Sequence, residues 1–214
     1  MEENKKPFLV VGGGIAGITC ALEAAEAGCR VILIEKSPYL GGRVARMHQY
    51  FPKLCPPICG LEINYKRIKN NPRITVLTMA ELQSLTGTPG NYEAVVKISP
   101  RYVGEECTLC DACTKVCPSE RADDFNYGLS KTKAIYISHN LTFPAMYAID
   151  RSACQESCRA CADACPYGAV KLDQRVEERT FNVAALVAAT GWEPEISYDQ
   201  TLQDMLDYWR ERVV

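Results

Sequence analysis

The sequence predicts an α/β fold of the nucleotide-binding type that is interrupted by a cysteine-rich segment. Residues 7–36 read as strand, glycine turn, helix and strand, which is the order and length of a βαβ unit. Residues 104–170 hold two tight groups of cysteines, and residues 179–194 return to a buried strand followed by a glycine turn. The flanking segments therefore look like two parts of one domain, with the cysteine segment inserted between them.

Composition and charge exclude several classes of protein. The chain has 214 residues, a net charge of −2 and a pI of about 5.8, so nothing favours binding to nucleic acid or to an anionic membrane. The first residues lack the apolar run of a signal peptide, and no apolar stretch approaches the roughly 20 residues that span a bilayer. We expect a soluble protein without direct membrane insertion.

The individual elements follow from local patterns. "PFLVV" (7–11) and "RVILIEK" (30–36) predict buried strands, and "ITCALEAAEAG" (18–28) between them has helical spacing. "RITVLTMAEL" (73–82) predicts a third strand, and residues 91–103 predict antiparallel strand material after the turn "TGTPGN". We expect one nucleotide-binding domain from residues 1–96 and 179–198, an inserted domain at 97–178, and an amphipathic helix at 199–214.

A G-x-G-x-x-G motif lies between the first strand and the helix. Gly12 allows the tight turn, Gly14 lets the backbone approach a pyrophosphate, and Gly17 permits close packing of helix and strand. Glu35 closes the second strand 18 residues after Gly17, where an acidic side chain binds ribose hydroxyls. A glycine-rich turn in an unrelated α/β domain is the alternative, but strand, helix and acid all occupy the expected positions.

Two further stretches resemble flavoproteins of the two-dinucleotide-binding type. In that class a G-G-R segment lies along the FAD phosphates, and an A-T-G strand end lies beside the same cofactor. "YLGGR" (39–43) and "VAALVAATGWEP" (183–194) match these segments. The resemblance adds six residues to the FAD site: Gly41, Gly42, Arg43, Ala189, Thr190 and Gly191. The later Gly-Asp strand end of such proteins is missing after Trp192, so the chain looks truncated.

The first cysteine group, "CTLCDACTKVCP" (107–118), matches the C-x2-C-x2-C-x3-C-P run of bacterial ferredoxins. The second, "CQESCRACADACP" (154–166), is one residue longer between its first two cysteines. In two-cluster ferredoxins the fourth cysteine of each run ligates the other cluster. This predicts two [4Fe–4S] ligand sets: Cys107, Cys110, Cys113 and Cys165 for the first cluster, and Cys154, Cys158, Cys161 and Cys117 for the second. Zinc is the alternative, but it has no redox chemistry to suit a flavin neighbour.

Cys55 and Cys59 form an additional C-x3-C pair in "KLCPPICGLEINYKRI" (53–68). For an isolated pair, two structural thiols beside a proline-constrained turn would be the simplest explanation. Here the pair directly follows the flavin-site stretch, so a redox pair near the flavin, or ligands of a further cluster, are the sharper hypotheses.

The order of all these motifs resembles the A subunit of heterodisulfide reductase-like complexes. The segments "CPPICGLEIN" (55–64), "KTKAIYIS" (131–138) and "ATGWEP" (189–194) contribute to the resemblance, and the compact insert looks most like the A subunit of quinone-interacting membrane-bound oxidoreductases. The resemblance implies a cytoplasmic protein with FAD and iron–sulfur clusters that passes electrons within a multi-subunit complex. A membrane-embedded, quinone-reactive partner would hold it at the inner face of the membrane.

Three functions follow as hypotheses. The first is an electron-transfer subunit of a multi-subunit oxidoreductase. The second is a stand-alone flavin enzyme that reduces a disulfide, or oxidises NAD(P)H, through Cys55 and Cys59. The third is a cluster-bearing structural module with an empty glycine loop. The first ranks highest because no second nucleotide site for NAD(P)H is visible in the sequence.

Overall fold

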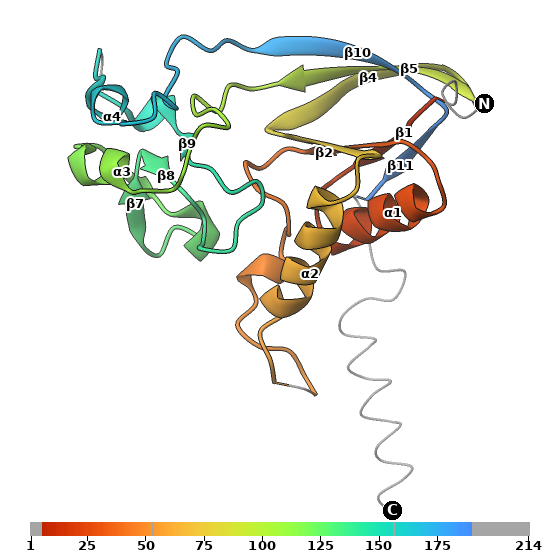
Figure 1. Ribbon diagram of the computed structural model, residues 1–214, viewed down its shortest axis with the longest axis horizontal. Helices are drawn as coiled ribbons and strands as arrows, with labels where there is room; N and C mark the ends of the chain where they lie inside the picture. The colour runs from red at the N-terminus through yellow and green to blue at the C-terminus, as the bar shows by residue number, and fades with distance from the viewer. Residues whose placement is uncertain (1–5, 53, 156, 190–214) are drawn as a thin grey trace, which may run out of the picture.

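The nucleotide-binding unit is built around a four-stranded parallel sheet. The computed structural model describes residues 6–52, 54–155 and 157–189. The sheet has the order β11-β1-β2-β3. Its strands are β1 (Phe8–Val11), β2 (Val31–Glu35), β3 (Ile74–Thr78) and β11 (Ala185–Ala188). The helices α1 (Ile15–Glu26) and α2 (Ile58–Lys69) cover one face, as Figure 1 shows.

A second, antiparallel sheet covers the other face of the parallel sheet. It has the order β10-β5-β4 and consists of β4 (Ala80–Thr88), β5 (Asn91–Ile98) and β10 (Glu177–Val183). Figure 1 shows these strands above β1 and β2, with the helices below, so the unit has three layers.

The side chains of the central strands alternate between two hydrophobic cores. In β2, Val31 and Leu33 pack against the helices, whereas Ile32 and Ile34 pack against the antiparallel sheet. Because successive side chains of a strand point to opposite faces, a strand that is covered on both sides must be apolar throughout. The continuous run "VILI" is the sequence expression of this arrangement.

Two predicted strands each prove to be two strands in different sheets. The single strand predicted at 73–82 is wrong: Met79 has a φ of 56° and turns the chain from β3 into β4. Ala184 separates β10 from β11, within the strand predicted from residue 179. The antiparallel strand predicted at 91–103 ends at Ile98. The helix α2 was not predicted.

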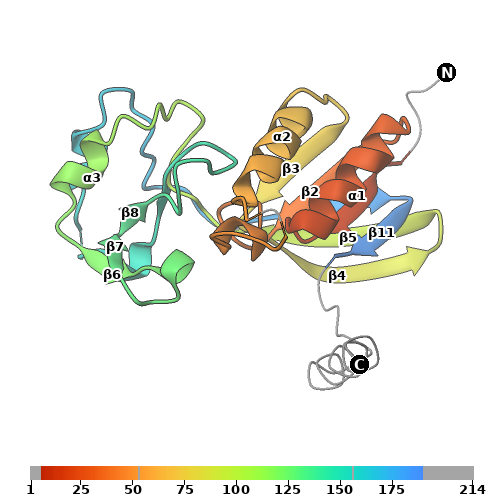
Figure 2. The same ribbon diagram turned by 90° about the horizontal axis from the view of Figure 1, so that it is seen from below.

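The insert lies beside the nucleotide-binding unit (Figure 2). It contains the short helices α3 (Ala112–Val116) and α4 (Ala160–Asp163) and two small antiparallel ladders. The ladders pair β6 (Glu120–Ala122) with β7 (Lys131–Lys133), and β8 (Ile135–Tyr136) with β9 (Ala148–Ile149). Three single 3-10 turns complete the described elements: Val44–Arg46, Asp124–Asn126 and Arg151–Ala153. The insert has its own core, which includes Ala134, Ile135 and Ala169.

The described residues include no helix that is both long enough and apolar enough to cross a membrane. The amphipathic helix predicted at 199–214 lies outside the described residues. The domain boundaries at residues 96–97 and 178–179 stay a prediction, although β10 begins at Glu177.

Candidate flavin and iron–sulfur sites

The glycine motif forms the turn between β1 and α1. Gly12 has a φ of 107°, which L side chains rarely adopt. A Cβ at Gly17 would lie 1.8 Å from the Gly12 carbonyl oxygen, so only glycine allows α1 to start this close to the turn. A Cβ at Gly14 would meet no atom within 4 Å. The space before the helix N-terminus is therefore open, which fits a ligand phosphate.

Glu35 is held at the end of β2 beside this turn. One carboxylate oxygen accepts a hydrogen bond from the Gly13 amide at 2.6 Å, and the other accepts one from the Ser37 amide at 2.7 Å. Each carboxylate oxygen can accept a further bond. The side chain is thus fixed in orientation and keeps acceptor capacity for ribose hydroxyls.

The "GGR" segment packs directly on the glycine turn. The Gly41 amide donates to the Gly13 carbonyl at 2.7 Å, and a Cβ at Gly42 would lie 3.2 Å from the Gly14 Cα. Both glycines have positive φ, at 109° and 54°. Arg43 follows them and is exposed. The planar fork of an arginine guanidinium is suited to binding phosphate.

The end of β11 reaches the same turn. The Ala189 amide donates to the Val11 carbonyl at 2.8 Å, and the Ala189 Cβ lies 3.2 Å from the position of a Cβ at Gly17. Residues from three distant parts of the sequence therefore meet at the glycine turn. Thr190 and Gly191, also predicted for this site, lie outside the described residues.

The cysteines predicted for the first cluster surround one cavity. The rest of the cavity lining is mostly apolar. Its lining includes Cys107, Cys110, Cys113, Cys165, Val103, Ile135, Tyr147, Tyr167, Ala169 and Val170. A cubane cluster requires four thiols spaced around a cavity, whereas a single metal ion requires thiols that converge on one position. Among the described residues, no three His, Cys, Asp or Glu side chains converge on a single metal-ion position.

The thiols of this cavity have different surroundings. Burial raises the pKa of the Cys113 thiol to about 12. Burial also acts on Cys165, but backbone N–H groups of residues 167–170 outweigh it and lower the pKa of that thiol. One of these groups, the Ala169 amide, donates to the Cys165 Sγ at 3.4 Å. Such N–H···S bonds stabilise a thiolate, so the chain supplies some of the charge compensation that a ligating sulfur needs.

The cysteines predicted for the second cluster also gather together. Burial raises the pKa of the Cys161 thiol, and the neighbouring thiols of Cys154, Cys117 and Cys158 raise it further. Burial likewise raises the pKa of Cys154, and Cys117 again contributes. Cys117 therefore lies with the cysteines of the second repeat, where its thiol donates to the Ser119 carbonyl at 3.5 Å.

The two repeats share two backbone features, although Asp111 is left-handed and its equivalent Arg159 is not. In each, the residue before the second cysteine is left-handed: Leu109 has a φ of 57° and Ser157 a φ of 58°. In each, the amide of the last cysteine donates three residues back at 3.3 Å, from Cys117 to Thr114 and from Cys165 to Ala162. The residue before the second cysteine therefore has the same left-handed conformation in both repeats, although the second repeat is one residue longer.

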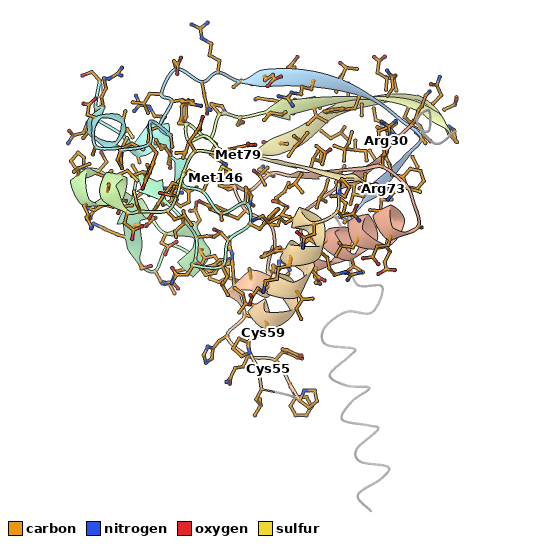
Figure 3. All side chains as sticks on the ribbon, viewed as in Figure 1. Arg30, Cys55, Cys59, Arg73, Met79 and Met146 are labelled. Atoms are coloured by element: carbon orange, nitrogen blue, oxygen red, sulfur yellow. The ribbon has the colours of Figure 1, made fainter. Side chains whose placement is uncertain are left out.

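Cys55 and Cys59 lie apart from both cysteine groups. Figure 3 shows Cys59 in the first turn of α2 and Cys55 in the segment that leads into it, at the end of the helix away from the sheets. Cys59 is exposed and Cys55 is half-buried. A hydrogen bond with the Cys55 thiol is the main cause that raises the pKa of Tyr50, and Cys59 adds to this effect. The structure thus brings both thiols near the Tyr50 hydroxyl.

Sequence reasoning missed a set of contacts that joins the two units. Arg101 stacks on the ring of Tyr39 at 5.1 Å, and the Tyr39 hydroxyl lies 2.9 Å from the Tyr136 carbonyl of the insert. The Leu40 amide donates to the Phe143 carbonyl at 2.8 Å, and the Phe143 ring stacks on Tyr65 of α2 at 5.6 Å. These contacts fix the insert against the loop that precedes "GGR". No local sequence pattern signals them.

Comparisons with known proteins agree with these two sites. Residues 7–89 match the family model "FAD dependent oxidoreductase", and residues 104–128 and 151–168 match the model "4Fe-4S binding domain". The chain is 37% identical over 207 residues to the iron–sulfur A subunit of the CoB–CoM heterodisulfide reductase of Methanocaldococcus jannaschii. The chain is thus similar in sequence to heterodisulfide reductase A subunits. It thus combines a Rossmann-like FAD-dependent oxidoreductase domain with an inserted 4Fe-4S binding domain.

The match covers most of this chain but less than a third of the length of these relatives. It includes 96% of this chain and 31% of the M. jannaschii protein. The A subunit of a ferredoxin:CoB-CoM heterodisulfide reductase of Methanosarcina acetivorans is 38% identical over 94% of this chain and 26% of its own length. Among solved structures, L-proline dehydrogenase from P. horikoshii matches 48% of this chain with a TM-score of 0.37 and 20% identity. The chain therefore spans less than a third of the length of either heterodisulfide reductase relative.

Proposed function

We propose that this chain is the flavin and iron–sulfur electron-transfer part of a heterodisulfide reductase-like complex. FAD would be held by Gly12, Gly14, Gly17, Glu35, Gly41, Gly42, Arg43, Ala189, Thr190 and Gly191. Two [4Fe–4S] clusters would be held by Cys107, Cys110, Cys113 and Cys165, and by Cys117, Cys154, Cys158 and Cys161. The observation that carries the proposal is the cavity lined by four cysteines from two separate repeats, in one chain with a glycine turn open to a phosphate.

The chain's own residues would perform three tasks. When bound, FAD exchanges electrons in pairs or singly, and the clusters exchange them singly. The glycine turn and the fixed carboxylate of Glu35 orient the nucleotide. The apolar lining of the cavity, with Val103 and Ile135, keeps water from the first cluster. The contacts of Arg101 and Phe143 hold the insert beside the flavin unit, so electrons need no diffusing carrier between them.

The partners and the location belong to the same proposal. Relatives named as heterodisulfide reductase subunits support an assembly with other subunits. We propose that the chain is cytoplasmic, and that a membrane-embedded quinone-reactive subunit brings it to the inner face of the membrane in a complex of the quinone-interacting type. Co-purification under anaerobic conditions would identify these subunits.

Quantification of iron, sulfide and flavin after anaerobic purification tests the cofactors. Two filled cluster sites give about eight iron and about eight sulfide per chain, together with flavin absorbance. A reconstituted preparation that holds zinc, or no iron, would contradict the proposal. A preparation with flavin but no iron would support the FAD site and contradict the cluster sites.

A second candidate function uses the thiol pair Cys55 and Cys59. The proximity of both thiols to Tyr50 and the exposure of Cys59 favour it. In this function the dithiol would pass two electrons and two protons to a disulfide substrate, forming a Cys55–Cys59 disulfide that the reduced flavin would reopen. With NAD(P)H supplied as the donor that re-reduces the flavin, it predicts disulfide turnover by the isolated chain that Cys59→Ser abolishes while Cys29→Ser does not. Equal turnover by the two variants would exclude it.

A further inference from the structure

Arg101 occupies the junction between the flavin unit and the insert. Its guanidinium donates to the Thr78 hydroxyl at 2.7 Å and to the Pro38 carbonyl, both in the flavin unit. It also donates to the Met146 and Tyr147 carbonyls of the insert, each at 3.4 Å. Arg101 lies in the segment that links the two units, and its side chain forms hydrogen bonds with both of them. Figure 3 labels Met146, and Met79, which follows Thr78 in the chain, at this junction.

The charge of Arg101 has no carboxylate partner among the residues that the structure describes. Its hydrogen-bond partners include four groups, the carbonyls of Pro38, Met146 and Tyr147 and the hydroxyl of Thr78, and it also stacks on the ring of Tyr39. Burial lowers the pKa of the Arg101 guanidinium, but arginine stays charged in proteins. The half-buried Arg121 of the insert is, by contrast, paired with both Asp124 and Asp150. A buried arginine without an acid is costly unless another negative group compensates it.

Two residues close to Arg101 line the cavity of the first cluster. Val103, two residues further along the chain, lines that cavity, and so does Tyr147, whose carbonyl accepts from Arg101. The Cys107 thiol is among the ionisable groups that interact electrostatically with the guanidinium. The four thiolates of an assembled cluster would therefore supply the negative charge that the described residues place nowhere else around Arg101.

We propose that Arg101 is a fixed positive charge that raises the reduction potential of the first [4Fe–4S] cluster above the value it would otherwise have. The proposal rests on the proposed function, in which Cys107, Cys110, Cys113 and Cys165 hold that cluster. Reduction adds a negative charge to the cluster, and a cation in a poorly polarisable surrounding stabilises the more negative state. Because Arg101 is bonded to both units, the same residue would fix this charge relative to the flavin. Arg101 acts here as a positioning residue.

Redox titration of the full chain, followed by electron paramagnetic resonance, tests this effect. In wild type we expect two one-electron waves, and Cys110→Ala should remove the wave of the first cluster and thereby identify it. In Arg101→Gln the equilibrium constant for reducing the first cluster should fall about tenfold, or about 59 mV for one electron. The second wave should stay in place. Arg179→Gln removes an exposed, acid-paired arginine of β10 and should shift neither wave.

Arg101→Lys separates charge from structure. Lysine keeps the positive charge but loses the planar fork, so the first wave should shift by less than half of the Arg101→Gln shift. If Arg101→Gln assembles less iron than wild type, the lysine variant decides: a full tenfold shift with both clusters present would overturn the proposal. Wild-type potentials in Arg101→Gln with full iron would also overturn it. A wild-type chain without iron would instead refute the proposed function itself.

Discussion

At the scale of single residues, Gly14 and Gly17 have different surroundings, which fit the different roles that the motif gives them. A Cβ at Gly17 would collide with the Gly12 carbonyl oxygen at 1.8 Å, whereas a Cβ at Gly14 would meet no atom within 4 Å. We expect Gly17→Ala to destabilise the fold by about 1–3 kcal/mol, since the backbone must move. Gly14→Ala should leave folding stability unchanged and lower only the flavin content.

Thermal unfolding and flavin content per chain, measured for both variants, check this contrast. Gly14 has a φ of −74°, which alanine adopts readily, so backbone strain cannot account for an effect at that position. Equal melting temperatures for Gly17→Ala and wild type would contradict the packing argument. Full flavin content in Gly14→Ala would show that the phosphate does not approach this backbone.

Cys117 is the second residue-scale test, because it lies with the cysteines of the other repeat. Paired variants give a clear outcome. Cys110→Ala with Cys113→Ala removes two ligands of the first cluster and should retain about four iron per chain. Cys110→Ala with Cys117→Ala damages both ligand sets and should retain almost none. If Cys117 ligated the first cluster, both double variants would hold about four.

At the scale of elements, helix α2 was predictable and the strand breaks were not. Leu61, Tyr65 and Ile68 recur at helical spacing and are all buried, so the pattern was present in the sequence. The change of sheet at Met79 depends on a left-handed conformation that methionine does not signal. The ferredoxin-type spacing predicted the two ligand sets, and the structure brings the cysteines of each set near one another; that they bind clusters stays a prediction. Arg101 could not be found this way, because its partners are carbonyls from distant loops.

Tyr65 anchors α2 to the flavin loop and gives a pH-dependent prediction. Its hydroxyl donates to the Leu40 carbonyl at 2.9 Å, and burial raises the pKa of Tyr65 to about 12 from its ordinary value of 10.0. The folded state therefore favours the neutral phenol. Its contribution is complete below pH 10 and is lost as the pH rises towards 12.

We expect Tyr65→Phe to lose about 1 kcal/mol of unfolding free energy at pH 7, the typical value of one hydrogen bond. Between about pH 10 and about pH 11 the stability of wild type should fall more steeply than that of the variant, because the variant has one titrating phenol fewer. Urea unfolding at both pH values measures this. Tyr127→Phe, which changes an exposed tyrosine, should match wild type throughout.

At the scale of the whole molecule, the insert leaves and re-enters the flavin unit at neighbouring points. Ile98 at the end of β5 pairs with Glu177 at the start of β10. The two connecting segments also run side by side, since the Lys171 amide donates to the Tyr102 carbonyl at 2.9 Å. The two units have separate hydrophobic cores, although Phe143 of the insert packs on the core of the flavin unit. This topology allows the insert to be exchanged without cutting the sheets.

Replacing residues 101–174 by a short Gly/Ser linker should therefore yield a folded flavin unit without iron. Its melting temperature should be lower than that of the full chain, because Tyr65 and Leu40 lose their contacts with Phe143. Circular dichroism, thermal unfolding and metal analysis check these outcomes. Phe143→Ala in the full chain is the matched control, since it removes the same ring and keeps both clusters. If the shortened chain fails to unfold cooperatively, the insert is part of the same folding unit as the flavin domain. The hydrogen bonds of Arg101 would then lie within one domain.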